Sequence, residues 1–255
     1  RYPDRRGALG GVRSWRQAVD GVSFAVPRGQ TLALVGESGC GKSSTGRALL
    51  GLQPEVGGSL RFRPQELPEG VELLQLPPRG WKAVRRRLAI VFQDSGSALN
   101  PRLKVWRSVA EPMEIHGLAR GPELRRRVDA LLESVGLDPA MGERYPAQFS
   151  GGQRQRLGVA RALGTSPELV VLDEVVSALD VLVQRQVLEL LQRLQEERGL
   201  SYLFISHDLA VVSGFAQRTA VMREGRIVEQ GPTAELFAAP QQDYTRRLLD
   251  AVPLL

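Results

Sequence analysis

A glycine-rich loop ending in lysine and serine sets the strongest limit on how this chain can fold. Residues 36–43 read Gly-Glu-Ser-Gly-Cys-Gly-Lys-Ser and fit the pattern G-x-x-x-x-G-K-[ST]. The apolar run Thr31–Val35 precedes the loop and predicts a buried strand, and a predicted helix, Ser43–Leu52, follows it. Glycines let successive backbone N–H groups turn toward phosphate oxygens, and the helix N-terminus adds positive potential. The loop therefore predicts a nucleotide phosphate site in an α/β fold.

Individual residues of this phosphate loop have distinct expected roles. The Lys42 ammonium is expected to reach the β- and γ-phosphates, and the Ser43 hydroxyl to coordinate Mg²⁺. The nucleotide-binding set expected from the loop is Gly36, Glu37, Ser38, Gly39, Cys40, Gly41, Lys42, Ser43 and Ser44. Cys40 is the only cysteine, which excludes an internal disulfide and a multi-cysteine metal site. Its alkylation is expected to obstruct nucleotide.

Two carboxylates follow a second apolar run. Leu169–Leu172 has the length of a buried strand, and Asp173 and Glu174 come directly after it. At such a strand end, Asp173 is expected to hold Mg²⁺ directly or through water. Glu174 is expected to face the γ-phosphate and polarise the attacking water, a role that typically contributes about 10²–10⁴-fold in rate. An ordinary acidic strand end is the alternative, which the upstream phosphate loop disfavours.

A third motif lies between these two. Phe149–Gln153 reads Phe-Ser-Gly-Gly-Gln and is followed by Arg-Gln-Arg-Leu at 154–157, shortly before the acidic strand end. Ser150 is expected to cap a helix whose N-terminal amides and dipole favour an anion. With these three motifs in this order, the sequence resembles the nucleotide-binding subunits of ATP-binding cassette (ABC) transporters over essentially its whole length. Ser150–Gln153 matches the signature motif of that family.

The resemblance implies an ATPase site that a second subunit completes. In this family two cassettes lie head to tail with two ATP molecules between them. The γ-phosphate on one phosphate loop then meets the signature motif of the other subunit. The residues implied to act in trans are Ser150, Gly151, Gly152 and Gln153. Asp180, within the matching segment Ser177–Asp180, is implied to lie at the same interface.

Further site residues follow from the same resemblance. Gln93 matches the glutamine that senses Mg²⁺ and connects to the membrane subunit. His207, after the apolar run Ser201–Ile205, matches the histidine that contacts the γ-phosphate. The implied catalytic residues are Lys42, Glu174 and His207, and the implied metal residues are Ser43, Gln93 and Asp173. An aromatic ring usually stacks on adenine, and Trp15 is the candidate for it, with Tyr2 a weaker one.

A closer resemblance is to the importers of oligopeptides and dipeptides, a group that includes relatives carrying nickel or glutathione. The segments that support it are 92–94 with 98–102, 177–181 with 186–188, and 243–249 with 252–253. Residues 153–156 and 206–212 resemble the second of the two ATPase types that such importers use. This implies a heterodimer with another cassette, with a homodimer as the alternative. The chain departs from the family in having Val175 where proline commonly follows the catalytic glutamate.

The remaining pattern predicts a single domain, 1–255, of the P-loop NTPase class. Strands alternate with helices, which favours a mainly parallel sheet covered by helices on both faces. The resemblance implies a RecA-like core formed by 1–94 and 166–255. Residues 95–165 are helical in pattern and predict an inserted lobe. A small antiparallel β region is expected near the N-terminus, with Val22–Val26 as a strand. Leu60–Phe62 is expected as an edge strand and Pro64–Gly80 as a loop.

Composition limits the possible partners. The formal net charge is +6, and arginine triplets occur at 85–87 and 125–127, each inside a predicted helix. No aromatic residues interleave with them, so a solvated helix face is favoured over a nucleic-acid surface. No apolar run approaches the roughly 18 residues that a membrane-spanning helix needs.

The function expected from the sequence is therefore a translocase subunit that uses ATP and Mg²⁺ to drive peptide import. Its expected partners are a second ATPase subunit, transmembrane permease subunits and, indirectly, an extracytoplasmic solute-binding protein, with no nucleic acid. It is expected at the cytoplasmic face of a bacterial inner membrane. The alternatives are an exporter cassette, a regulatory subunit that binds ATP but hardly hydrolyses it, and a nucleic-acid- or ribosome-associated ABC ATPase. The last class usually carries a coiled-coil insertion, zinc cysteines or a second cassette.

Overall fold

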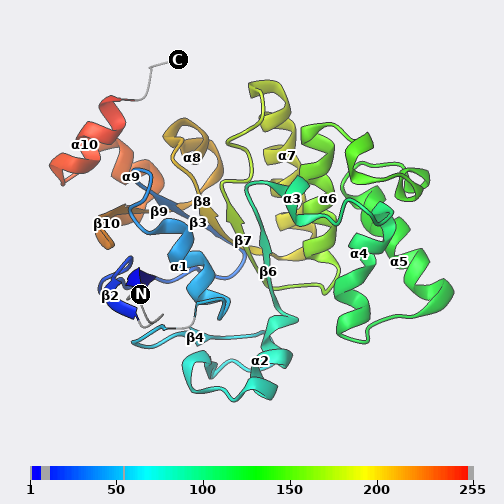
Figure 1. Cartoon of the computed structure of the whole chain (residues 1–255). Coiled ribbons are helices and arrows are strands. Elements are labelled where there is room, and N and C mark those ends of the chain that lie inside the picture. Colours follow the sequence, from blue (N-terminus) through cyan, green and yellow to red (C-terminus); the bar gives the residue numbers. More distant parts are fainter. Residues whose placement is uncertain (1, 7–11, 54, 252–255) are drawn as a thin grey trace. The chain divides into compact units, whose positions relative to one another are not determined.

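The computed structural model describes residues 2–6, 12–53 and 55–251 (Figure 1). Contacts between residues divide the chain into two compact units. Unit 1 comprises 1–27, 31–81 and 203–255, and unit 2 comprises 28–30 and 82–202. The predicted helical lobe, residues 95–165, lies within unit 2, and its status as a separate lobe stays a prediction.

The sheet of unit 1 is built around a fully buried strand. β3 (Thr31–Val35) pairs in parallel with β9 (Arg218–Arg223), which pairs antiparallel with β10 (Arg226–Pro232). All five residues of β3 are buried, as expected for a strand covered on both faces. The helices of this unit are α1 (Lys42–Leu49), α8 (Leu209–Phe215), α9 (Thr233–Ala238) and α10 (Asp243–Asp250). The phosphate loop connects β3 directly to α1.

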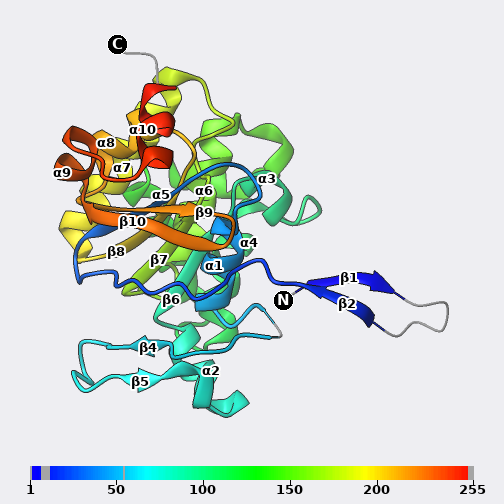
Figure 2. The ribbon, with the colours of Figure 1, turned by 90° about the vertical axis from the view of Figure 1, so that its left-hand side faces the viewer.

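Two small antiparallel pairs complete the strands of unit 1. β1 (Tyr2–Arg6) pairs with β2 (Val12–Arg16), and β4 (Arg61–Phe62) pairs with β5 (Val71–Glu72), as Figure 2 shows. These pairs confirm the antiparallel region expected near the N-terminus. The predicted edge strand at residues 60–62 is present as β4.

The predicted strand Val22–Val26 is wrong. This segment forms no ladder with another strand in the described parts of the chain. Its alternation still has a physical basis, because Val22, Phe24 and Val26 are half-buried whereas the two residues between them are exposed. The pattern reported burial of one face correctly, but burial alone does not create a strand when no neighbouring backbone supplies hydrogen bonds.

The predicted loop Pro64–Gly80 holds more structure than its prolines suggested. It contains β5, a short 3₁₀ helix (Leu73–Gln75) and the start of α2 (Pro78–Arg85). The carboxylate of Glu72 organises this segment by accepting the Leu60 N–H at 2.6 Å. Pro78 begins a helix rather than interrupting one, since the missing N–H of proline costs nothing in the first helical turn.

Unit 2 combines a parallel strand pair with most of the helices. β6 (Leu88–Val91) pairs in parallel with β7 (Leu169–Asp173), in register from Leu88↔Leu169 to Val91↔Leu172. The helices are α3 (Ser95–Ala98), α4 (Val105–Ile115), α5 (Gly121–Ser134), α6 (Gly151–Leu163) and α7 (Val181–Arg198), with 3₁₀ turns at Pro139–Glu143 and Pro146–Gln148. β8 (Ser201–Ile205) begins in unit 2, and its last three residues belong to unit 1.

Apolar residues at helical spacing form much of the core of unit 2. The apolar stripe of α5, with the cap residue Val135, is buried: Leu124, Val128, Leu131, Leu132 and Val135. Gly136 follows the helix with a φ of 73°, the left-handed conformation in which glycine ends helices at little cost. The apolar stripe of α7 is buried in the same way, and that helix ends at Gly199 in the left-handed conformation.

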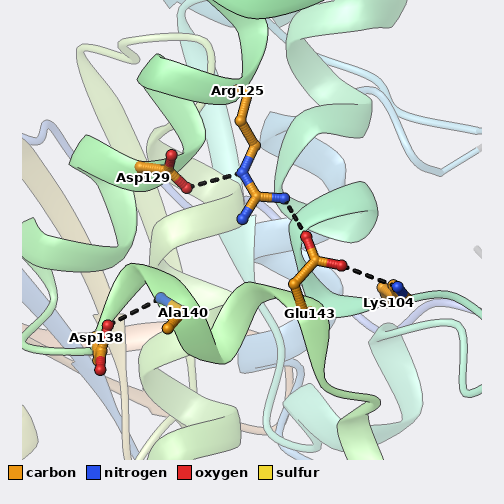
Figure 3. Close-up of polar contacts among 6 residues, drawn as sticks. All are labelled: Lys104, Arg125, Asp129, Asp138, Ala140 and Glu143. Atoms are coloured by element: carbon orange, nitrogen blue, oxygen red, sulfur yellow. Dashed lines mark hydrogen bonds and ion pairs between the residues drawn. The ribbon is translucent and has the colours of Figure 1, made fainter.

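Arg125 of α5 lies between the carboxylates of Asp129 and Glu143 (Figure 3). Arg125 forms ion pairs with Asp129, at 3.0 Å, and with Glu143, which also accepts a hydrogen bond from Lys104 at 2.9 Å. Hydrogen bonds from Lys104 and Arg125 hold the pKa of the Glu143 carboxyl below its ordinary value. Arg126 and Arg127 both pair with Glu123. This pairing suits a solvated helix face, where water and salt screen each ion pair.

Replacing Leu132 by alanine tests the packing of unit 2. The side chain is fully buried, so Leu132→Ala is expected to lower the free energy of unfolding by about 2–5 kcal/mol. Chemical denaturation followed by circular dichroism measures the change. The control is Leu182→Ala, at an exposed position, which should shift stability by less than about 0.5 kcal/mol. Equal effects of the two substitutions would contradict the packing described here.

Candidate functional site

The phosphate loop of unit 1 is shaped by close backbone contacts. Gly36 and Gly41 have φ values of 145° and 112°, which side-chain-bearing residues rarely adopt. A Cβ atom at Gly36 would overlap the carbonyl oxygen of Met222 in β9, and one at Gly41 would overlap the carbonyl oxygen of Ala18. Both glycines are therefore required by conformation and by space. The loop is held against β9 and the chain near residue 18.

Lys42 holds the loop from inside. Only 5% of this residue is exposed, and its Nζ atom donates hydrogen bonds to the carbonyl oxygens of Gly36 at 2.7 Å and Glu37 at 2.9 Å. α1 begins at Lys42 with Gly41 as its N-cap, so the cap residue has no side chain to cover the amides of the first turn. The Lys42 charge and the amides at the start of α1, which have no side-chain cap, together form a surface of the kind that binds anions.

Cys40 is buried within the same loop. Burial raises the pKa of its thiol, an effect that the nearby Lys42 charge only partly offsets. The thiol is consequently a poorer nucleophile at neutral pH than an exposed cysteine, because less of it is thiolate. This places the cysteine as a packed residue of the loop.

His207 lies directly after β8 in unit 1, and its side chain is exposed. Its neighbours fix the turn: the Ser206 hydroxyl accepts the Asp208 N–H at 3.0 Å, and the Asp208 carboxylate caps α8 by accepting the Val211 N–H at 3.2 Å. This turn therefore presents a polar side chain at the end of a buried strand, as the sequence predicted.

In unit 2, the two carboxylates sit at the end of β7 as predicted. Asp173 is 4% exposed. Glu174 has a φ of 52°, a left-handed conformation that is strained for a residue with a side chain. The Ser177 hydroxyl donates to the Glu174 carbonyl at 2.9 Å, and Gln93 Nε2 donates to the Ser177 hydroxyl at 3.3 Å. Hydrogen bonds of Ser177 thus connect its own segment with those of Gln93 and Glu174.

The turn after Glu174 is anchored by burial rather than by proline. Val175 and Val176 are both almost completely buried. Proline would fix φ at that position; here the packed valine side chains and the Ser177 hydrogen bond restrain the turn instead. The side chain of Glu174 remains half-buried, at the surface of unit 2.

Ser150 caps α6, which confirms the expected cap. Its hydroxyl accepts the Gln153 N–H at 3.3 Å, and the Gln153 side-chain oxygen accepts the Ser150 N–H at 3.0 Å. This reciprocal capping box satisfies two amides that would otherwise lack helical partners. Ser150 and Gly151 are exposed, whereas Gly152 is buried.

The segment around Asp180 lies beside this motif. A Cβ atom at Gly152 would overlap a methyl group of Val183, and one at Gly151 would lie 3.6 Å from the Leu179 side chain. Asp180 caps α7 by accepting the Val183 N–H at 3.0 Å. Gly152 therefore permits the close packing that places two predicted interface segments on one exposed surface of unit 2.

The predicted residues fall into two groups. The phosphate loop and His207 belong to unit 1, and Gln93, Ser150, Asp173, Glu174 and Asp180 belong to unit 2. Their joining into one site is part of the proposed function. The side chains of Trp15 and Tyr2 lie outside the described part of the structure, so adenine stacking on them stays a prediction.

One residue that sequence reasoning missed is Tyr244 in α10. Its hydroxyl accepts the N–H of Glu37, a residue of the phosphate loop, at 3.2 Å. In the sequence, the C-terminal segment indicates only a resemblance to peptide importers. No local pattern predicts a contact between residues 207 positions apart.

Comparison with known proteins identifies the family of this chain. Residues 19–177 match the family model described as ABC transporter. The chain is 48% identical over 254 residues to the glutathione import ATP-binding protein GsiA of Pectobacterium atrosepticum, covering all of this chain and 40% of that protein. It is 48% identical over 243 residues to a putative peptide import ATP-binding protein of Brucella abortus, covering 95% of this chain and 71% of that protein. The chain thus spans less than half of the first relative and most of the second.

Solved structures share the fold. The dimeric ATP-binding cassette MJ0796 bound to ADP and Pi aligns with a TM-score of 0.74 and 26% identity, covering 85% of this chain and 90% of that one. The cbiO1 protein of Clostridium perfringens, part of the ABC transporter complex cbiONQ, aligns with a TM-score of 0.76 and 26% identity, covering 92% and 89%. These alignments confirm the predicted fold class, a mainly parallel sheet with helices.

Alkylation of Cys40 tests the buried geometry of the loop. Because burial raises the pKa of this thiol, N-ethylmaleimide should modify it more slowly at neutral pH than it modifies an exposed cysteine, and faster as pH rises. Mg-ATP is expected to slow the reaction further, and the modified chain should no longer bind ATP. Mass spectrometry follows the reaction, and Cys40→Ser provides the unlabelled control. Complete labelling that leaves ATP binding intact would contradict the expectation.

Proposed function

Because this chain belongs to the ABC transporter family, we propose that it is the ATP-hydrolysing subunit of an importer whose cargo is peptides. The observation that carries the proposal is the phosphate loop, with its buried lysine and close-packed glycines, in a chain with the cassette fold. The names of its relatives support the cargo class, because the glutathione import protein and the putative peptide import protein are each 48% identical to this chain. Glutathione is itself a small peptide.

ATP is proposed to bind with its phosphates in the loop of residues 36–44. Lys42 would exchange the carbonyl oxygens of Gly36 and Glu37 for oxygens of the β- and γ-phosphates. The backbone amides of the loop and the start of α1 would supply the remaining contacts. Trp15 is proposed to stack on adenine.

The residues proposed to hold Mg²⁺ suit a hard cation. Ser43 in the first turn of α1, Gln93 and the nearly buried Asp173 offer a hydroxyl, an amide and a carboxylate, all with oxygen donors. Bound Mg²⁺ would neutralise charge on the phosphate oxygens, as in other P-loop enzymes.

Hydrolysis is proposed to depend on Glu174 and His207. Glu174 would orient a water molecule and accept its proton as the oxygen attacks the γ-phosphorus. The bond from phosphorus to the bridging oxygen of ADP then breaks, and phosphate leaves. His207 would contact the γ-phosphate, and Lys42 would stabilise the charge there. Most of the acceleration in such reactions comes from positioning and electrostatics. The strained backbone at Glu174, held by the Ser177 hydroxyl, supports such a positioning role.

The site is proposed to be completed by a second cassette arranged head to tail. Ser150, Gly151, Gly152 and Gln153 would meet the γ-phosphate bound by the partner, with Asp180 at the same interface. Val181 and Leu182, which follow Asp180, are 83% and 69% exposed. Apolar side chains so exposed beside the two interface segments support a contact there. The resemblance favours a second, different ATPase subunit, with a homodimer as the alternative.

The permease is proposed to dock on unit 2 beside Gln93. A cavity of about 250 Å³ there is lined by residues of β6, α4 and α6, among them Ile115, and by Phe92 and His116, which directly follow β6 and α4. Phe92 and Ile115 expose a large part of their apolar surface, and Gln93 follows the first of them directly. Movement of a permease element in this cavity would be felt at Gln93, and through Ser177 at Glu174.

The site of action proposed for the chain is the cytoplasmic face of a bacterial inner membrane, as a peripheral subunit. Within the described residues, no helix combines the length and apolar character that crossing a bilayer requires. Attachment would come from the permease, which would in turn receive cargo from an extracytoplasmic solute-binding protein.

Replacing Glu174 by glutamine tests the proposed chemistry. Glutamine keeps the size of the side chain but cannot accept the proton of water, so ATP turnover should fall by about 10²–10⁴-fold while ATP remains bound. Phosphate release and retention of radiolabelled ATP measure the two effects, with the second ATPase subunit present. Glu196→Gln, at an exposed position on α7, should hydrolyse ATP like the unmodified chain. Unchanged turnover in Glu174→Gln would contradict the proposal.

A further inference from the structure

The C-terminal helix of the described chain touches the phosphate loop directly. α10 (Asp243–Asp250) follows α9 near the end of the chain (Figure 1). Tyr244, in its first turn, is only 7% exposed. The Tyr244 hydroxyl accepts the backbone N–H of Glu37 at 3.2 Å. Both residues belong to unit 1, so this contact lies within one compact body.

Contacts with the sheet of unit 1 hold Tyr244 in place. The guanidinium of Arg223, at the end of β9, lies 5.0 Å from the centre of the tyrosine ring. The carboxylate of Glu229 in β10 accepts the N–H groups of Gln241 and Gln242 at 2.8 and 3.1 Å, which fixes the chain just before α10. These contacts therefore restrain the position of the Tyr244 hydroxyl at the phosphate loop.

The backbone of Glu37 is held on both sides. Its N–H group is bound by the Tyr244 hydroxyl, and its carbonyl oxygen by the ammonium of Lys42 at 2.9 Å. The bond to the Glu37 carbonyl oxygen uses the Lys42 ammonium, which the proposed function assigns to the phosphates of ATP. When Lys42 turns to ATP, the carbonyl oxygens of Gly36 and Glu37 lose that donor. The bond to Tyr244 does not involve Lys42 and can persist.

We propose that Tyr244 is a positioning residue for ATP binding: its hydroxyl keeps the first arm of the phosphate loop in shape while Lys42 moves to the phosphates. This inference rests on the proposed function. Tyr244 does not touch the nucleotide in this account and acts only through the Glu37 backbone. The C-terminal helix thereby becomes part of the nucleotide site, although it lies far from the phosphate loop in the sequence.

The first test observes the contact without nucleotide. Tyr244→Phe keeps the ring over which Arg223 lies and removes only the hydroxyl. Amide hydrogen exchange, read residue by residue by NMR, should show the Glu37 amide exchanging roughly tenfold faster in this variant, the scale expected for loss of one hydrogen bond. The amide of Thr45, which donates to the Gly41 carbonyl at 2.9 Å, should be unchanged and serves as the internal reference. Equal exchange at Glu37 would overturn the inference.

The second test measures Mg-ATP affinity by calorimetry. Tyr244→Phe is expected to bind roughly three- to tenfold more weakly than the unmodified chain, the range of one neutral hydrogen bond. Tyr202→Phe is the matched control. It removes the same atom from another buried tyrosine, whose hydroxyl donates to the Leu191 carbonyl at 3.0 Å. This control should lower the melting temperature but leave the ATP affinity unchanged.

The outcomes separate a positioning role from a structural one. If Tyr244→Phe lowers the melting temperature while its ATP affinity stays that of the unmodified chain, the tyrosine only stabilises the fold and the inference is wrong. Lys42→Ala separates the inference from the proposed function. If the unmodified chain binds no ATP, or if Lys42→Ala binds it equally well, the proposed function fails and the positioning role fails with it. If Lys42→Ala loses ATP and Tyr244→Phe does not, only the positioning role is overturned.

Discussion

The proposed chemistry of this chain depends first on the ammonium of Lys42, which bonds the backbone of its own loop. Hydrogen bonds to the Gly36 and Glu37 carbonyl oxygens satisfy a nearly buried charge that would otherwise be costly to hold. The glycines allow the loop to approach β9 closely enough for this geometry. The loop is thus shaped before an anion arrives, and in the proposed function binding would replace the carbonyl oxygens by the more negative phosphate oxygens.

Unit 2 carries Glu174, Ser150 and Asp180, and hydrogen bonds restrain the segments that contain them. The turn after β7 holds Glu174 in a strained conformation, and Ser177 links it to Gln93. Beside it, Gly152 brings two capped helices together, so that Ser150 and Asp180 belong to one exposed surface. In the proposed function this surface meets the nucleotide of a partner. A change at Gln93, where the permease is proposed to dock, would reach the backbone of Glu174 through the single hydroxyl of Ser177.

Local signals allowed much of this to be predicted from sequence. The phosphate loop, the strands before it and before Asp173, and the Ser150 cap depend on short-range rules of glycine conformation, apolar runs and helix capping. The structure confirms these features. The predicted strand Val22–Val26 is wrong because an alternating apolar pattern indicates that one face is buried, but does not show that a neighbouring strand is present. The helix at Pro78 was missed because proline breaks a helix interior but suits a first turn. Tyr244 was missed because its contact is set by the tertiary fold alone.

In the proposed function, nucleotide draws Lys42 from its own backbone and is then enclosed by Ser150 of a second protomer. A crystal structure of the Glu174→Gln chain assembled with Mg-ATP and its partner cassette tests this most directly. We expect Lys42 Nζ to have left the carbonyl oxygens of Gly36 and Glu37 for the β- and γ-phosphates, with a partner's signature helix at the γ-phosphate. A triphosphate bound away from the loop, or Lys42 still on its backbone partners beside bound ATP, would contradict it.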